Sequence, residues 1–211
     1  MLSRITEFIK KMKPDIVGLI EVDNGSYRNK RRCQALEMAK TLGYVSSYNS
    51  KYAGHSVAHK IPVMNKQGNA FLTRPTIKNT TFHFFNKGFK RLAIELELEQ
   101  VTIFLVHLSL TYRSRQWQLN GLYDLLKEVK TPAIVAGDFN MFWGRQEMQL
   151  FLAATGLVNA NHNHMPTYPS QKPTRQLDFI LHSPQINVTE FQVCKDITYS
   201  GHLPIFCQFE V

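Results

Sequence analysis

The chain is built around the stretch TPAIVAGDFN, residues 131–140. Its short apolar run, Ala133 to Ala136, predicts a buried strand, and Gly137 would let the backbone turn where that strand leaves the sheet. Asp138 and Asn140 follow two residues apart, so strand alternation predicts that both side chains lie on one face, at the mouth of a sheet. A carboxylate beside an amide can hold a hard cation or orient a water molecule or a phosphate oxygen. The same residues are also typical of a plain strand-to-loop turn, so this stretch alone leaves both interpretations open.

Length and composition describe an ordinary globular chain. It has 211 residues and no Pro/Gly/Ser-rich linker, which predicts a single domain over residues 1–211. Its 25 Lys and Arg against 16 Asp and Glu give a net charge of +9. That balance favours anionic partners such as nucleic acid, phosphorylated molecules or an anionic lipid surface. The basic residues cluster little, so the charge also fits a role in solubility alone.

The cysteines and the hydropathy pattern bear on the compartment. Cys33, Cys194 and Cys207 share no motif spacing, and their odd number argues for buried free thiols in a reducing environment. No apolar run approaches the length of a membrane span, and no signal peptide opens the chain. We therefore expect a soluble, cytoplasmic protein without a transmembrane segment.

Helices are predicted where apolar residues recur with helical spacing, and strands where they alternate or run together. The predicted helices cover residues 2–13, 28–42, 113–129 and 145–155. Trp117 belongs to the predicted apolar face of the third, and Gly43 and Gly156 are expected to end the second and the fourth. The predicted strands cover residues 15–20, 44–48, 68–73, 91–99, 101–106, 133–136, 176–181, 186–193 and 205–211. His55 and His59 have the spacing of a helical metal site, but Pro62 and the nearby glycines favour a loop there.

Several predicted strands end in residues that carry chemistry. The continuous apolar run 15–20 predicts a strand buried on both faces, and it places Glu21 at the carboxyl end, where open α/β sheets locate their sites. The strand 101–106 delivers His107 to the same end of the sheet. Asp178 lies among apolar residues, where a buried carboxylate needs a partner.

Six blocks of sequence resemble, in order, those of the endonuclease/exonuclease/phosphatase superfamily, the fold of pancreatic deoxyribonuclease, abasic-site endonucleases and neutral sphingomyelinases. The blocks are DIVGLIEVD (15–23), GNAFL (68–72), VHL (106–108), GDFN (137–140), LDFI (177–180) and SGHLP (200–204). Each block is weak alone, but together they keep the family's order and cover nearly the whole chain. The resemblance implies an α/β sandwich of two stacked mixed β-sheets flanked by helices, here lacking the first strand of the family.

The resemblance also implies a catalytic site for phosphoester hydrolysis. Glu21 would hold Mg²⁺ or Mn²⁺ together with Asp138, which would also place or activate the attacking water. Asp178 would fix the tautomer and orientation of His202, which would act at the phosphate.

Three further residues are expected to contact the substrate. Asn140 would bind a phosphate oxygen, and His107 would donate to the phosphate. Arg28 lies downstream of the Glu21 block, as in metal-dependent hydrolases of this kind, and is expected to bind substrate as well.

Two features depart from the family pattern. Members usually read Ser-Asp-His where this chain has Ser200-Gly201-His202, so a carboxylate on the metal or water side is missing. Members also usually begin with a strand that ends in an Asn beside the metal, whereas Met1 here opens the helix that would follow that strand, so either the gene start is truncated or the protein lacks the strand. The lack of a central strand is expected to leave a gap in one sheet, with unpaired backbone groups or an exposed edge.

These residues favour a Mg²⁺-dependent phosphodiester or phosphoester hydrolase, with nucleic acid among its candidate substrates. Gly201 and the lacking strand support a second hypothesis, a weakened or inactive member that acts as a phosphate- or nucleic-acid-binding module. A third hypothesis, an interaction protein with no phosphate ligand, leaves the polar residues at the strand ends unexplained.

Overall fold

The computed structural model describes residues 1–23, 25, 32–50, 67–88, 90–144 and 146–211. The helices are α1 (Leu2–Met12), α2 (Gln34–Leu42), α3 (Tyr112–Glu128) and α4 (Gln146–Thr155). The strands are β1 (Ile16–Asp23), β2 (Val45–Ser50), β3 (Gln67–Thr73), β4 (Asn79–Phe84), β5 (Leu92–Glu97), β6 (Thr102–His107), β7 (Ala133–Asp138), β8 (Val158–Asn159), β9 (Asp178–His182), β10 (Asn187–Val193) and β11 (Ile205–Glu210). Arg28, His55 and His59 lie outside the described residues.

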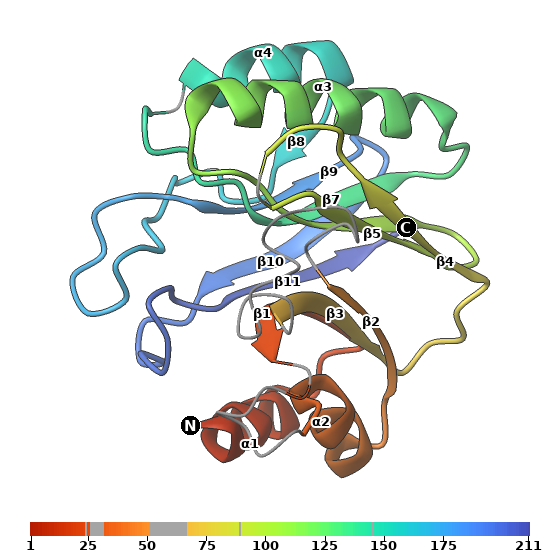
Figure 1. The fold of residues 1–211 in the computed structure, drawn as a ribbon, viewed down its shortest axis with the longest axis vertical. Coiled ribbons are helices and arrows are strands. Elements are labelled where there is room, and N and C mark those ends of the chain that lie inside the picture. Colours follow the sequence, from red (N-terminus) through yellow and green to blue (C-terminus); the bar gives the residue numbers. More distant parts are fainter. Residues whose placement is uncertain (24, 26–31, 51–66, 89, 145) are drawn as a thin grey trace.

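The elements stack as helices, sheet, sheet and helices (Figure 1). One layer is a six-stranded sheet with the order β4-β5-β6-β7-β9-β8, and it is mixed because β6 and β7 run parallel. Helices α3 and α4 cover its outer face, and α1 and α2 cover the outer face of the second layer. The predicted α/β sandwich is therefore confirmed.

The second layer is divided. It consists of a three-stranded sheet, β1-β3-β2, and a two-stranded sheet, β10-β11, both antiparallel. Within the described residues, β1 pairs with β3 alone and β11 with β10 alone, and no strand bridges the two sheets. The expected gap in one sheet is present, and it leaves β1 and β11 each with an edge that no other strand of the described residues pairs with.

Side-chain alternation along the large sheet fills two cores. Leu92, Ile94 and Leu105 pack toward the second layer. Ala93 and Phe104, their neighbours in sequence, pack toward α3 and α4. A third core lies between the helices α1 and α2 and the three-stranded sheet. The alternation fixes which side chains at the strand ends point into the same layer, and so it positions the candidate site.

Strand β1 is less buried than the sequence predicts. Its apolar run identifies the strand correctly, but only Val22 is buried, whereas Gly18 and Glu21 are exposed. A strand with one unpaired edge retains solvent contact along that edge, which a continuous apolar run cannot reveal.

Two helical predictions also need correction. Helix α2 begins at Gln34, and Cys33 before it is extended, with φ −88° and ψ 110°. Positive charge is unfavourable at a helix N-terminus, which accounts for Arg32 lying before the helix. Trp117 was expected inside α3's apolar face but is 51% exposed, and the Lys87 ammonium lies 4.6 Å from the centre of its ring.

The three cysteines are free thiols, of which only Cys194 is buried, while Cys33 and Cys207 are half-buried. Among the described residues, no helix is both long enough and apolar enough to cross a membrane.

Candidate functional site

Three predicted site residues form a row across neighbouring strands. His107 ends β6, Asp138 ends β7 and Asp178 begins β9, and the sheet register pairs His107 with Asp138 and Asp138 with Asp178. Residues directly opposite one another on adjacent strands project from the same face. Accordingly, His107 Nε2 lies 3.2 Å from Asp138 Oδ2. The row is a direct consequence of the sheet register.

Gly137 makes this row possible, although not as a turn. It lies inside β7 with φ 143°, in a backbone region that side chains rarely adopt. A Cβ atom there would lie 1.9 Å from the backbone oxygen of Val106, on β6. Glycine at this position therefore allows β7 to approach β6 closely, which brings Asp138 beside His107.

Asn140 lies just beyond β7, where the chain turns out of the sheet. Its backbone is left-handed, with φ 52°. The Asn140 amide N–H donates to Asp138 Oδ1 at 2.9 Å, and its Nδ2 donates to the backbone oxygen of Leu108 at 2.8 Å. The strand-to-loop turn that the sequence allowed is thus present, and it is built from the same two polar residues as the candidate site.

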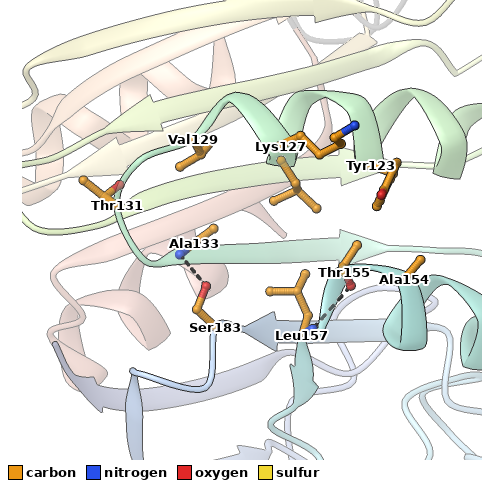
Figure 2. A pocket seen from close by; sticks show the side chains of 10 residues that line it. Tyr123, Lys127, Val129, Thr131, Ala133, Ala154, Thr155, Leu157 and Ser183 are labelled. Carbon is orange, nitrogen blue, oxygen red and sulfur yellow. Dashed lines mark hydrogen bonds between the residues drawn. The ribbon is translucent and has the colours of Figure 1, made fainter.

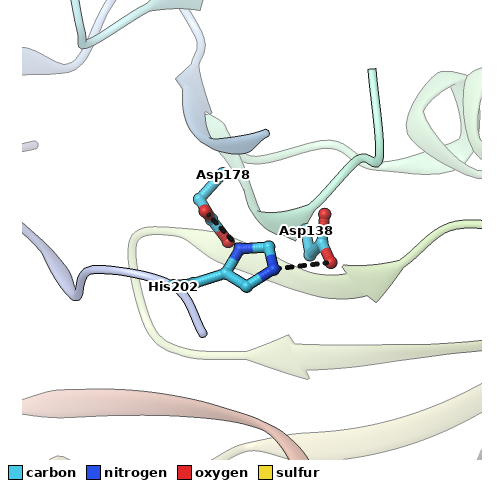
Figure 3. Close-up of side chains that lie close together, drawn as sticks. All are labelled: Asp138, Asp178 and His202. Carbon is cyan, nitrogen blue, oxygen red and sulfur yellow. Dashed lines mark hydrogen bonds and ion pairs between the residues drawn. The ribbon is translucent and has the colours of Figure 1, made fainter. Parts of the chain in front are cut away.

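His202 reaches the row from the loop before β11, and its ring lies between two carboxylates (Figure 3). Its Nδ1 is 2.8 Å from Asp178 Oδ2, which is the hydrogen bond the sequence predicted, and its Nε2 is 4.0 Å from Asp138 Oδ2. Thr167 Oγ1 donates to the same Asp178 oxygen at 2.5 Å. These two donors hold the Asp178 carboxylate, which in turn orients the imidazole.

Glu21 comes from the other layer and completes the group. Its Oε1 lies 3.9 Å from His107 Nδ1 and 3.9 Å from Lys90 Nζ, and its side chain is 46% exposed. The backbone N–H of Glu21, which has φ 58°, faces Asn69 Oδ1 at 3.4 Å. Contacts therefore run without interruption from Glu21 through His107, Asp138 and His202 to Asp178.

Burial and hydrogen bonding set the charge states of the two aspartates differently. Burial raises the pKa of Asp138, but the hydrogen bond with His107 and the one from the Asn140 amide outweigh it, so the net pKa is lowered. Burial also raises the pKa of Asp178, and there the nearby Asp138 charge adds to it, so the net pKa is raised despite the bond with His202.

The two histidines are shifted in opposite directions. Burial dominates at His107 and lowers its pKa, which favours a neutral ring. At His202 burial also lowers the pKa, but the hydrogen bond and the charge of Asp178 outweigh that effect and raise it. The site thus pairs a neutral imidazole with one that favours its charged form.

The donor set suits a hard cation. Ligand atoms of Asp138, Asp178 and His202 all lie within 4.8 Å of one another. Within that trio the carboxylates are already bridged by the His202 ring, whereas Glu21 offers a half-exposed carboxylate that faces a positive ammonium, that of Lys90. Two buried nitrogens close to Glu21, His107 Nδ1 and Asn69 Nδ2, have no hydrogen-bond partner. These two nitrogens without partners are consistent with a polar ligand binding beside Glu21.

Sequence reasoning missed three contributors: Lys90, Thr167 and the orienting role of Asn69. Lys90 and Thr167 lie in loops and reach the site only through the fold, so nothing in their sequence neighbourhood indicated them. Asn69 stands in the GNAFL block, whose match to the family pattern was the signal that could have found it.

Two surface hollows lie away from this group. One lies between α3, α4 and the beginning of β7, next to Ala133 and Ser183 (Figure 2). Asp138 stands at the other end of the same strand. Another lies beside Asn161 and β10. The candidate site is defined here by its converging polar side chains.

Fold and site together define an α/β sandwich that gathers carboxylates and imidazoles at one end of its large sheet. The sequence profile of the Endonuclease/Exonuclease/phosphatase family matches residues 2–199. The chain belongs to this family. The comparison with curated proteins finds no match.

Solved structures share the fold at low sequence identity. An endonuclease/exonuclease/phosphatase from Beutenbergia cavernae matches with a TM-score of 0.76 and 20% identity, over 100% of this chain and 66% of that one. A mannosyl-6-phosphatase from Bacteroides thetaiotaomicron matches with a TM-score of 0.75 and 16% identity, over 100% and 90% of the two chains. A 3′ phosphatase from Neisseria, bound to a product DNA hairpin, matches with a TM-score of 0.75 and 15% identity, over 100% and 94%.

Proposed function

We propose that this chain is a Mg²⁺-dependent phosphoester hydrolase and that residues 1–211 act as one domain. The observation that carries the proposal is the unbroken line of contacts from Glu21 to Asp178, which joins three carboxylates and two imidazoles from both layers of the sandwich. Family membership supports it, and so do the phosphatases among the structures of the same fold.

Glu21 and Asp138 would hold the metal, with Mn²⁺ as a possible substitute. Both offer carboxylate oxygen, which small hard cations prefer, and Glu21 is open enough to leave further positions for water. A bound Mg²⁺ would supply positive charge to the phosphoryl oxygens and to a water nucleophile.

Side chains of the protein would orient the attacking water and bind the phosphate. Asp138, whose lowered pKa keeps it ionised, would orient the attacking water. Asn140 uses one Nδ2 hydrogen for the Leu108 carbonyl, and the second would bind a phosphate oxygen. His107 would donate to the phosphate.

His202 would act at the phosphate with Asp178 behind it. Its Nδ1 is committed to Asp178, so Nε2 is the nitrogen that would face the substrate, and the raised pKa favours a donor there. A charged imidazole next to phosphoryl oxygens would stabilise the negative charge that develops on them.

The substrate is a phosphoester, and the charge of +9 leans towards nucleic acid. Arg28 would also contact the substrate. The free thiols favour a reducing compartment, and we place the protein in the cytoplasm.

A second function is favoured by two specific features. Gly201 brings no carboxylate to the site, and the second layer is divided beside the strand that carries Glu21. A protein weakened in this way would still bind phosphate or nucleic acid without turning it over.

The test is a hydrolysis assay on bis-p-nitrophenyl phosphate, a phosphomonoester and plasmid DNA, each with Mg²⁺, with Mn²⁺ and with EDTA. We expect metal-dependent turnover that falls by about a hundredfold or more in Asp138→Asn, since the amide fills the same volume but cannot orient water as an anion. Asp124→Asn, an exposed aspartate of α3, is the matched control and should retain full activity. Phosphate or DNA binding without turnover would establish the binding module in place of the hydrolase.

A further inference from the structure

Lys90 directs a positive charge into the candidate site from a loop that precedes β5. Its Nζ contacts His107 Nε2 and lies 3.9 Å from Glu21 Oε1. The side chain is only 17% exposed, which is unusual for lysine. A mostly buried ammonium between a carboxylate and an imidazole is a specific placement and not a solvated surface charge.

The fold holds this loop in place. Gln118, a fully buried residue of α3, donates through Nε2 to the backbone oxygens of Lys90 at 2.5 Å and Lys87 at 3.0 Å. Its Oε1 accepts from the backbone N–H of Ser109 at 2.8 Å. One side chain therefore ties the Lys90 loop to the segment that directly follows His107.

Gly88, two residues before Lys90, packs closely against α3 and the segment after β6. Gly88 has φ 99°, and a Cβ atom there would lie 2.3 Å from Ser109 Oγ and 2.6 Å from Gln118 Nε2. Glycine suits this position because its positive φ is one that other residues rarely adopt. The backbone of Lys90 is thus tied through Gln118 to α3 and to the segment after β6.

The local charges explain what the ammonium does. Glu21, Asp138 and Asp178 place negative charge where a phosphate must bind, and each repels an anionic ligand. An ammonium beside Glu21 offsets this repulsion, and an ammonium forms strong, charge-assisted hydrogen bonds with phosphoryl oxygens. Lysine is well suited to this role because it binds phosphate as a compact point charge.

We propose that Lys90 is a phosphate-binding residue of this site and that its ammonium competes with a divalent cation for the space beside Glu21. The identification of the ligand as a phosphoester rests on the proposed function. The inference goes further in assigning phosphate affinity that does not require metal.

Isothermal titration calorimetry with inorganic phosphate, in EDTA, tests the first part. Wild type should bind, and Lys90→Met should bind at least about tenfold more weakly, since one charge-assisted contact is lost. Lys90→Arg, which retains the charge, should lose much less phosphate affinity.

Lys87→Met is the matched control, because Lys87 lies three residues away on the same loop and its ammonium covers Trp117. The phosphate affinity of this variant should stay within about twofold of wild type. Circular dichroism checks folding, and Lys90→Gln replaces the methionine variant if that one is unstable.

Titration with Mn²⁺ in the absence of phosphate tests the second part. Removing a neighbouring positive charge should tighten Mn²⁺ binding by about threefold or more in Lys90→Met. A lysine that merely supported the structure would not move the two affinities in opposite directions. Unchanged phosphate affinity in Lys90→Met, an equal loss in Lys87→Met, or no phosphate binding by wild type would each overturn the inference.

Turnover separates this inference from the proposed function. Wild type that binds phosphate through Lys90 but hydrolyses nothing would support the role of Lys90 and overturn the hydrolase. Wild type that hydrolyses substrate, with Lys90→Met matching it in both phosphate affinity and KM, would overturn the role of Lys90 and leave the hydrolase standing.

Discussion

The residue at position 201 bears on the choice between the two proposed functions, a hydrolase and a binding module. Gly201 lies beside His202, has no heavy atom within 4 Å of where a Cβ atom would lie, and does not use a left-handed backbone. An aspartate therefore fits without strain, and its carboxylate would add an anion on the metal or water side. If this missing group weakens the site, Gly201→Asp should raise metal-dependent hydrolysis by about tenfold to a hundredfold.

The assay compares wild type, Gly201→Asp and Gly201→Asn at matched Mg²⁺, with circular dichroism to confirm folding. The asparagine variant adds the same volume without the charge and should stay at the wild-type rate. A folded Gly201→Asp protein no faster than wild type would show that this position does not limit the site.

The raised pKa of His202 predicts a pH-dependent contribution to stability. In the folded state the Asp178 carboxylate favours the charged ring and outweighs burial. Because the folded pKa lies above the ordinary value of 6.5, the stabilisation is fully present below pH 6.5 and is lost as the pH rises through the folded pKa. Thermal unfolding of wild type and His202→Gln should therefore differ more at pH 6 than at pH 9. A constant difference across that range would mean that the charge of His202 contributes nothing to stability.

At the scale of elements, one buried ion pair joins α3 to α4 below the site. Arg115 is fully buried, and its Nη2 lies 2.5 Å from Glu147 Oε2. Arg115 also donates to the backbone oxygens of Ser109 and Leu110, which follow the strand that carries His107. Removing one partner leaves an uncompensated buried charge, so Arg115→Met should cost about 3–5 kcal/mol of unfolding free energy.

Urea unfolding measures this cost. The double variant Arg115→Met/Glu147→Met removes both charges and should recover part of the loss, while Arg113→Met, an exposed arginine on the same helix, should be nearly neutral. A double variant as unstable as the sum of the two single variants would mean that the two charges do not stabilise each other.

The elements themselves were largely predictable, because helical periodicity and strand alternation are local. Helices α1, α3 and α4 begin and end close to the predicted residues, and Gly43 and Gly156 take the expected left-handed conformation at helix ends. The burial of β1 was not predictable, since it depends on whether a second strand lies beside it. Trp117 was misplaced for a similar reason: Lys87, from a distant loop, covers its ring at the surface.

The site residues that lie at the ends of strands were predictable from the sequence. His107, Asp138 and Asp178 each lie at an end of a recognisable strand, and the sheet register then aligns them. Lys90 and Thr167 come from loops whose positions depend on Gln118 and on the contact with Asp178. Such tertiary contacts have no periodic signature, so sequence reasoning found the residues that lie in the recognisable blocks, including the loop residues Asn140 and His202, and missed Lys90 and Thr167.

At the scale of the whole molecule, the two layers differ in continuity. The six-stranded sheet is continuous and has packed cores on both faces. The second layer is split between β1 and β11, each of which has one edge without a sheet partner among the described residues. A two-stranded sheet is marginal on its own and depends on the layer beneath it. The division therefore places the least stable part of the sandwich next to the strand that carries Glu21.

Amide hydrogen exchange followed by mass spectrometry should reveal this difference. Peptides from β6 and β7, which have strands on both sides, should exchange slowly, because opening them requires nearly global unfolding. Peptides from β10 and β11 should exchange at least about tenfold faster, since only one neighbour protects each strand. Strand β4 is the internal control: it is also an edge strand, but it belongs to the continuous sheet, so it should fall between the two. Protection of β11 equal to that of β7 would contradict the prediction, and it would mean that the two halves of the second layer unfold only together with the rest of the sandwich.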